Sequence, residues 1–424
     1  MQPRLGFAHL FLGKEGNAIA TRPLAVRVIN AAGGVAQRFG LRPGLGREEL
    51  LAAAQASTGL SDFGPASFQE GLTVLLNSLE DEARLTTIGR VAARRRIINL
   101  LETRLRLLDY RKHHPDVAAQ HIRSPIFVLG LPRTGTTVLY GMLASDPRLR
   151  SPASWEVARP FPPPHDADMS TDPRIAATAK EFDQFRRLVP GIDQIHPLGA
   201  TLPQECLALQ APEFTSYEYP TTFQVPGYWA WLREQDLRPA YEFERCFLQH
   251  LQSGYARERW LLKTPAHLMW LDTLLEVFPD ALLVHTHRNP TQVLASVSSL
   301  MFTLRSAMSD GVDPAAVGAE HFEAWAWGLD RTMAVRNGLA ADRVIDVHYR
   351  DTVADPVGTV RRIYDHFGIE MTAAAEAGVT AYLAANPRDK HGAHRYSLEE
   401  FGLDRTAVND RFAEYRERFD VQES

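Results

Sequence analysis

The fold is decided by residues 126–143, which read IFVLGLPRTGTTVLYGML. Residues 126–131 form an apolar run of β-branched and aromatic side chains, which is typical of a buried parallel strand. Residues 132–137 combine proline, glycine and threonine, and residues 138–143 return to apolar side chains at helical spacing. The stretch therefore predicts a strand, then a glycine-containing loop, then a helix.

Two further stretches repeat this alternation. Residues 281–288 (ALLVHTHR) predict a second strand, and residues 291–300 have helical spacing. Residues 343–349 predict a third strand, which leads into a helix near residues 357–367. Strands that alternate with helices predict an α/β fold, in which a mainly parallel sheet is flanked by helices on both faces.

The rest of the chain adds two helical segments. Residues 1–120 predict a helical N-terminal region, because apolar residues recur there at three- and four-residue intervals. We expect residues 121–424 to form the domain that contains the sheet. Within it, the aromatic-rich segment 155–275 should cover the carboxyl edge of the sheet, where ligands bind in such folds. The basic run from Arg94 to Lys112 predicts a solvated helix face, and we assign it no function.

Composition excludes several classes of protein. The 424 residues contain 46 Lys and Arg against 51 Asp and Glu, a formal net charge of −5, which argues against a nucleic-acid partner. Two cysteines are too few for a disulfide framework. The sequence has no apolar run of the roughly 18 residues that span a membrane, and its first residues lack a signal-peptide pattern. We therefore expect a cytoplasmic protein without a membrane span.

Residues 130–137 (GLPRTGTT) have the glycine spacing of a phosphate-binding loop. In such a loop, backbone N–H groups and the start of the following helix converge on an anion. Thr136 stands where an NTPase has its phosphate-bridging lysine, so ordinary ATP or GTP hydrolysis is disfavoured, and Arg133 supplies a cation within the loop instead. The alternative interpretation is a plain strand-to-helix turn in which Thr134 caps the helix.

The loop and its helix, GLPRTGTTVLYGMLASDP, resemble the 5′-phosphosulfate-binding loop of the P-loop sulfotransferases, which use 3′-phosphoadenosine 5′-phosphosulfate (PAPS). The resemblance continues in order through LLKTPAHL, FPDALLVHTHRNPTQVLASVSSL, VHYRDTVADP and NPRDKHGAHRYSLEEFGL. It is closest to the bacterial members and to the tyrosylprotein sulfotransferase branch. It implies a P-loop NTPase-like α/β fold, PAPS as the sulfuryl donor, and no metal.

The resemblance also implies roles for individual residues in donor binding. The cradle for the 5′-phosphosulfate corresponds to Arg133, Thr134, Gly135, Thr136 and Thr137. The residues that correspond to contacts with the 3′-phosphate and the nucleotide are Arg288, Ser296 and Tyr349, together with Lys390 and Arg395 in a late basic loop.

For catalysis, the resemblance identifies Lys263, at the end of an apolar run, with the family's active-site lysine, which stabilises the leaving bridging oxygen together with the charge of Arg133. The general base is left open among several residues. Glu156 ranks first, by its interval from the loop in the tyrosylprotein branch. His267 ranks second because other branches use a histidine, and Glu205 ranks third. His196 is a further rival.

The reaction implied is transfer of a sulfuryl group to a hydroxyl of a small aromatic or apolar acceptor, such as a phenol, sterol, lipid alcohol or polyketide. An ATP-dependent small-molecule kinase is one alternative, although Thr136 counts against it. A non-catalytic nucleotide-binding scaffold is another, in which Lys263 would be unnecessary.

Overall fold

The computed structural model describes residues 22–166, 169–387 and 396–422. At its centre lies a five-stranded parallel sheet in the order β2-β3-β1-β4-β5. The α/β class and the parallel sheet expected from the sequence are confirmed. The strands are β1 (Ile126–Gly130), β2 (Leu149–Arg150), β3 (Arg259–Lys263), β4 (Leu282–His287) and β5 (Val344–His348).

The central strand β1 buries both of its faces, as its apolar sequence predicts. Ile126 and Val128 point into a smaller core under α6 (Thr136–Leu143), α18 (Pro356–His366) and α19 (Ala373–Ala385). Phe127 and Leu129 point into the larger core, because successive side chains of a strand face opposite ways. The larger core also involves the helices α13 (Arg238–Gly254), α14 (Leu271–Val277), α15 (Pro290–Met308) and α16 (Pro314–Arg336).

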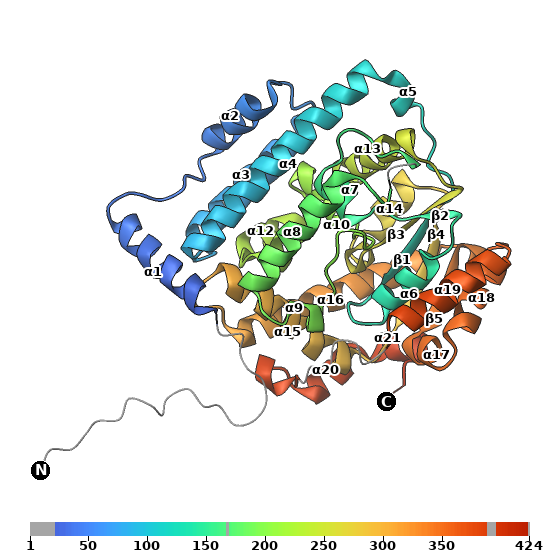
Figure 1. Cartoon of the computed structure of the whole chain (residues 1–424). Coiled ribbons are helices and arrows are strands. Elements are labelled where there is room, and N and C mark those ends of the chain that lie inside the picture. The colour runs from blue at the N-terminus through green and yellow to red at the C-terminus, as the bar shows by residue number, and fades with distance from the viewer. Residues whose placement is uncertain (1–21, 167–168, 388–395, 423–424) are drawn as a thin grey trace, which may run out of the picture.

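The N-terminal helices share the larger core with the sheet. Leu72 and Leu101 belong to the same buried cluster as Phe214 and Leu262 of β3. The change near residue 120 is therefore one of secondary structure, not a break between two cores. Figure 1 shows these helices on the side of the molecule away from β5. They are α1 (Leu24–Arg38), α2 (Arg47–Thr58), α3 (Phe68–Asp81), α4 (Thr87–His113) and α5 (Pro115–Ala118).

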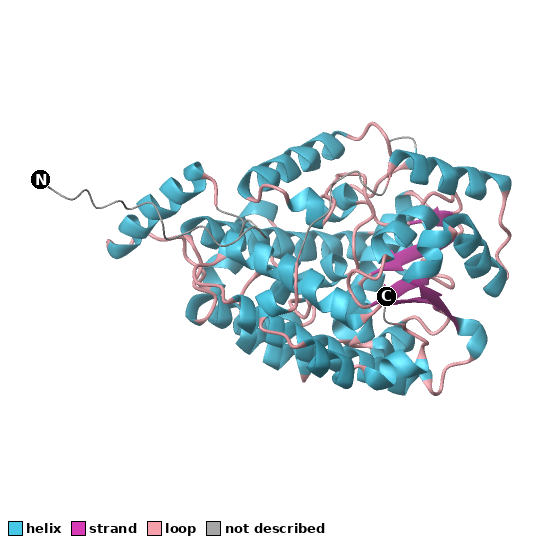
Figure 2. Cartoon of the chain, turned by 90° about the horizontal axis from the view of Figure 1, so that it is seen from below, coloured by secondary structure: helices cyan, strands magenta, loops and turns pink. Residues whose placement is uncertain are grey.

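The segment between β2 and β3 consists of helices joined by turns, and α8 (Pro173–Leu188) and α13 are its two long helices. Figure 2 shows how small the sheet is beside the helices around it. The helices of this segment before α13 are α7 (Ser154–Ala158), α8 (Pro173–Leu188), α9 (Ile192–Ile195), α10 (Leu207–Gln210), η2 (Ala211–Glu213), α11 (Glu218–Thr222) and α12 (Pro226–Arg233).

Shorter helices complete the described chain: η3 (Pro265–Leu268), η4 (Ala341–Arg343), α17 (Tyr349–Ala354), η5 (Glu399–Phe401), α20 (Arg405–Arg411) and α21 (Ala413–Arg418). None of the helices in the described ranges has both the length and the apolar character needed to cross a membrane.

Candidate active site

The loop after β1 depends on its two glycines. Gly130 has φ +144° and Gly135 has φ +84°, conformations that side-chain-bearing residues rarely adopt. A Cβ on Gly130 would lie 2.3 Å from Oγ1 of Thr286, and one on Gly135 would lie 2.8 Å from the ring of Tyr349. The glycine spacing therefore lets the loop pack directly against β4 and against the residue that follows β5.

Helix α6 begins with no side-chain cap. Its N-cap is Gly135, and the hydroxyl of Thr134 is turned inward instead, where it donates to the carbonyl of Leu131 (2.7 Å) and lies 2.6 Å from Oγ1 of Thr286. Thr136 is buried and Thr137 is exposed at the start of the helix. The first backbone N–H groups of α6 are therefore available to an anion, and the Thr134 hydroxyl holds the loop onto β4.

Four side chains from three segments meet beside the loop. Arg133 donates from Nε to Oγ of Ser296 on α15 (3.0 Å) and from Nη1 to the carbonyl of Ile195 (2.6 Å). Arg288, directly after β4, donates from Nη1 to the carbonyl of Arg133 (2.8 Å). Its guanidinium carbon lies 4.2 Å from the ring centroid of Tyr349. The structure thus gathers residues that lie more than 200 positions apart in the sequence.

No acidic side chain of the described residues forms a recorded ion pair with either guanidinium of this cluster. Across the described ranges, the recorded hydrogen-bond acceptors of Arg133 and Arg288 are carbonyl, hydroxyl and amide oxygens, not carboxylates. Burial lowers the pKa of Arg133, Tyr396 opposes that shift, and the charge of Arg288 reinforces it. Because arginine keeps its charge, a bound anion would relieve the repulsion between the two groups.

A second cluster lies at the end of β3. Nζ of Lys263 donates to Oε1 of Glu205 in a largely buried ion pair, and Oγ1 of Thr264 donates to Oε2 of the same carboxylate (3.0 Å). The backbone N–H of Cys206 donates to the carbonyl of Lys263 (3.0 Å), which fixes Glu205 beside the strand. The structure therefore places Glu205, the third-ranked base, in direct contact with the lysine.

His196 interacts electrostatically with this pair. Burial lowers the pKa of His196 to about 4; Glu205 opposes this shift, and Lys263 and Arg133 reinforce it. Burial by itself would raise the pKa of Glu205, but the charge of Lys263, the carboxylate's electrostatic interaction with His196 when that ring is protonated, and the hydrogen bonds from Lys263 and Thr264 hold it below its ordinary value of 4.5. At neutral pH the cluster contains an ammonium, a carboxylate and a neutral imidazole.

The carboxylate of Glu156, the first-ranked base, helps to hold the fold together. The side chain is fully buried at the start of α7. Its Oε1 accepts from Nη2 of Arg150 (2.7 Å), and its Oε2 accepts from the backbone N–H of Ala153 (2.7 Å). Both oxygens are therefore engaged in pairing Arg150 and in holding the first turn of a helix, so this geometry does not favour Glu156 as the base.

His267, the second-ranked base, lies in the interior of the larger core. Its Nδ1 is 2.9 Å from the hydroxyl of Tyr241, and its ring meets Phe127 edge-on at a centroid distance of 5.0 Å. Burial lowers its pKa to about 3. The imidazole has no surface exposure and belongs to the core on one face of the sheet. This position does not favour a contact with an acceptor.

The two late basic residues, Lys390 and Arg395, lie outside the described residues. Two further residues contact the site and were not predicted from the sequence. Thr264 binds Glu205 at the end of β3, and Thr286 of β4 binds Thr134 in the loop after β1. Both stand at the carboxyl end of an apolar strand, and that position was the signal that could have identified them.

Two groups within the described residues have enough potential ligand atoms for a metal ion. They are Cys206, Glu244 and His267, and His285, His287 and Asp346. In the second group, Asp346 is already paired with Arg336. In the first, Gln210 donates to Oε2 of Glu244 (2.8 Å), and burial raises the pKa of Glu244 to about 7. Neither group contains a residue of the loop after β1.

A cavity of about 940 Å³ lies between α4 and α8. Its wall extends to Ala208, three residues after Glu205, and to Leu188, at the start of the segment that leads to His196. Apolar residues from several helices line the cavity, including Val91, Ala92, Leu100, Phe161, Phe185 and Phe247.

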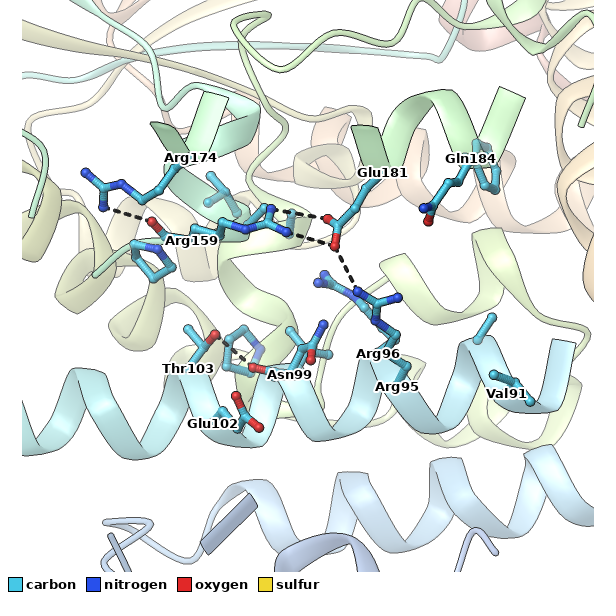
Figure 3. A pocket seen from close by; sticks show the side chains of 18 of the residues that line it. Val91, Arg95, Arg96, Asn99, Glu102, Thr103, Arg159, Arg174, Glu181 and Gln184 are labelled. Atoms are coloured by element: carbon cyan, nitrogen blue, oxygen red, sulfur yellow. Dashed lines mark hydrogen bonds and ion pairs between the residues drawn. The ribbon is translucent and has the colours of Figure 1, made fainter. Parts of the chain in front are cut away.

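The charged residues around the cavity are paired with one another. Figure 3 shows Glu181 of α8 between Arg159 and Arg95, which approach it to 2.8 and 3.0 Å. Arg96 donates two hydrogen bonds of 2.7 Å to Glu218. The basic run of α4 is thus only partly a solvated face: it lines this cavity, and Arg104 is buried in an ion pair with Glu213.

The sheet and its loop define a class of protein. Each residue gathered at the loop and at β3 lies at the carboxyl ends of parallel strands, where open α/β sheets bind their ligands. A glycine loop, an uncapped helix start and two arginines that have no carboxylate partner among the described residues point to an anionic, phosphate-bearing ligand. The chain therefore has the architecture of a nucleotide-binding α/β protein.

Comparisons with known proteins refine this class. The model described as the sulfotransferase family matches residues 125–373. The chain is similar in structure to sulfotransferase STF1 from Mycobacterium tuberculosis H37Rv, with 35% identity, coverage of 87% of this chain and 98% of that one, and a TM-score of 0.78. It is also similar to sulfotransferase STF9 from Mycobacterium avium, with 30% identity, coverage of 89% and 97%, and a TM-score of 0.81.

Among curated proteins, the chain is 26% identical over 314 residues to omega-hydroxy-beta-dihydromenaquinone-9 sulfotransferase Stf3 from Mycobacterium bovis. The match covers 70% of this chain and 74% of that protein. The chain belongs to the sulfotransferase family. The enzyme class expected from the sequence is confirmed.

Proposed function

We propose that this sulfotransferase transfers a sulfuryl group from PAPS to the hydroxyl of an acceptor that carries a long apolar chain. The observation that carries the proposal is the meeting of Arg133, Arg288 and Ser296 beside an uncapped helix start, with the Lys263–Glu205 pair at the end of β3, the strand next to β1. The arginine cluster can bind the phosphate groups of the donor, and the Lys263–Glu205 pair can assist the transfer of the sulfuryl group. A scaffold that only bound a nucleotide would need the first cluster alone.

The donor-binding residues fit a ligand with two separate anionic groups. The N–H groups at Thr136 and Thr137 and the guanidinium of Arg133 hold the 5′-phosphosulfate. Arg288 and Ser296, from the next strand–helix unit, hold the 3′-phosphate. Tyr349 is fixed by Gly135 and Arg288 and contacts the nucleotide.

Lys263 assists the departure of the bridging oxygen. The bound donor supplies an activated sulfuryl group, which passes to the acceptor oxygen while the bridging oxygen leaves with negative charge. An ammonium held at this edge of the sheet stabilises that charge, as preorganised donors do in other group transfers. Lys263 is only slightly exposed, so solvent screens this interaction weakly.

We propose Glu205 as the general base. In the free protein its carboxylate is held by Lys263 and Thr264. When Lys263 turns toward the donor's leaving oxygen, Oε1 of Glu205 loses its cation and its affinity for a proton rises, so that it can accept the hydroxyl proton. His196, neutral at pH 7, lies beside it and can orient the hydroxyl.

The α4–α8 cavity supports an apolar acceptor. Its aliphatic and aromatic wall favours a hydrocarbon chain, and each arginine that lines it already has a carboxylate partner. The relative from Mycobacterium bovis is named for an omega-hydroxylated menaquinone derivative. We place the reaction in the cytosol, which the free thiols Cys206 and Cys246 fit.

Isothermal titration tests the donor assignment. We expect 3′-phosphoadenosine 5′-phosphate to bind more tightly than 5′-AMP, and more tightly than ATP with Mg²⁺. A second assay supplies PAPS and a long-chain primary alcohol and looks for the sulfate ester by mass spectrometry. Preference for ATP would overturn the proposed donor, and selective nucleotide binding without product from any chain length would overturn the proposed acceptor.

A further inference from the structure

Helix α1 carries an apolar stripe that faces solvent. Six of the nine large hydrophobic residues exposed in the described ranges lie between positions 24 and 41. Leu24, Val28, Val35 and Phe39, which we call the α1 stripe, are 72, 59, 55 and 78% exposed. Their spacing of four, seven and four residues places them along one side of the helix.

The opposite side of α1 is anchored, so the stripe has a fixed direction. Oδ1 of Asn30 accepts from the backbone N–H of Ile88 at the start of α4 (3.1 Å). A Cβ on Gly33 would lie 2.2 Å from Oγ1 of Thr87, which shows how closely the two helices approach. Nε of Arg22 donates to the carbonyl of Ser306 on α15 (2.9 Å). The helix therefore cannot turn its stripe inward without losing these contacts.

The charged residues of the segment that carries the stripe are all basic. Residues 22–46 contain four arginines and no acidic residue. Arg22 and Arg42 pair with Asp310 and Glu80, whereas Arg27 and Arg38 are exposed and have no ion pair within the described chain. At 100° per residue, Arg27 and Arg38 lie together on one flank of the stripe.

We propose that the α1 stripe docks on the surface of an anionic phospholipid bilayer. A helix with one apolar face and basic flanks lies in the plane of a membrane interface, with its apolar side chains among the acyl chains and its arginines at the headgroups. A second copy of this chain fits less well, because joining two stripes would bring Arg27 and Arg38 of both copies together without an acidic partner.

The position of α1 links the bilayer to the α4–α8 cavity. Ile29, on the flank of α1 away from the arginines, lines that cavity together with Val91 of α4. Figures 1 and 2 both place α1 at the end of the molecule opposite the sheet. A chain leaving the membrane beside α1 would enter the cavity and extend toward Ala208 in its wall. This route rests on the proposed function, whereas the docking itself does not.

Vesicle flotation of the full chain tests the docking with neither donor nor acceptor present. We expect binding to vesicles of phosphatidylcholine with phosphatidylglycerol and weak binding to phosphatidylcholine alone. Replacing the stripe by serine (Leu24→Ser, Val28→Ser, Val35→Ser, Phe39→Ser) should lower the partition coefficient by about a hundredfold or more. Arg27→Gln with Arg38→Gln should lower it roughly thirtyfold on the anionic vesicles only.

A matched control is Val138→Ser, which removes an exposed apolar residue from α6, far from α1 in the sequence, and should leave vesicle binding unchanged. Because every substituted side chain is exposed, thermal unfolding should be nearly the same in all variants. The proposal is overturned if the wild-type protein remains at the bottom of the gradient. It is also overturned if the serine variant of the stripe floats with the vesicles as well as the wild type does. A dimer in solution that the serine variant abolishes, without vesicle binding, identifies a second copy as the occupant instead.

Discussion

The carboxyl edge of the sheet, where we propose that the donor binds, and the α4–α8 cavity are built in different ways. At this donor edge, which consists of residues 130–137 and 286–296, short stretches of sequence carry both the backbone shape and the side chains. The cavity wall takes single residues from positions as distant as Ile29 and Met308. A phosphate-bearing donor needs fixed N–H groups and charges, whereas a hydrocarbon chain needs only an apolar surface of suitable size. Substitutions should therefore act sharply at the first region and gradually at the second.

The largest effect is expected for Lys263→Met. Removing the ammonium takes away stabilisation that acts only as the bridging oxygen leaves, so kcat should fall about a thousandfold. Binding of 3′-phosphoadenosine 5′-phosphate should change little, and thermal unfolding should show whether the unpaired Glu205 lowers stability. Lys112→Met, at an exposed lysine paired with Asp62, is the control. Full turnover by Lys263→Met would remove the lysine from the mechanism.

Glu205→Gln should lower kcat about a hundredfold, because the hydroxyl proton loses its acceptor. Since the pKa of Glu205 in the free protein lies below 4.5, wild-type kcat/KM should stay level on acidification through the ordinary glutamate range and fall only below it, as the carboxylate protonates. The acid limb of kcat should lie at higher pH, because Lys263 no longer holds the carboxylate in the donor complex. His196→Gln, measured alongside, should cost less; the reverse order would assign the base to His196.

Arg288→Ala should weaken binding of 3′-phosphoadenosine 5′-phosphate roughly thirtyfold, because a charge-assisted hydrogen bond to phosphate is lost. Binding of 5′-AMP, which lacks the 3′-phosphate, should change much less, and isothermal titration measures both. Arg350→Ala, near the end of the neighbouring strand β5, serves as the control. Equal losses for the two nucleotides would mean that Arg288 does not distinguish the 3′-phosphate.

Ala92→Phe narrows the α4–α8 cavity and should raise KM for a long-chain alcohol about tenfold, because several methylene groups of the alcohol lose their contacts with the apolar wall. A short-chain alcohol should be unaffected, which separates the cavity from the donor edge. Ala52→Phe, on the exposed side of α2, is the matched control. A similar rise in KM for both alcohols would show that the chain does not occupy this cavity.

The smallest effect is expected for Glu181→Gln, which removes the ion pairs to Arg95 and Arg159 that Figure 3 shows. Partly exposed pairs of this kind contribute up to about 1 kcal/mol, so thermal unfolding should shift by only a few degrees and kcat by less than about twofold. The shift should vanish in high salt. A large, salt-independent loss of activity would show that the pairing shapes the acceptor site.

The contrast between the two glutamates shows where prediction from sequence ends. The sequence interval ranked Glu156 above Glu205, yet the carboxylate of Glu156 binds Arg150 and the backbone of Ala153, six and three residues away. The partner of Glu205 is Lys263, 58 residues later, which becomes a neighbour only when the segment before α10 pairs with the end of β3. The interval along a chain cannot distinguish a carboxylate that holds the first turn of a helix from one that pairs with a lysine at the end of a strand.

The sequence by itself determined the α/β class and the family, because strand periodicity and the glycine loop are local properties of the backbone. Only the tertiary structure decided that Glu205 meets Lys263, that the basic run of α4 lines a cavity, and that α1 turns an apolar stripe outward. These features depend on which helix faces and side chains meet, and which stay exposed, once the core is packed. Packing joins residues from the whole chain, so no single stretch of sequence encodes them.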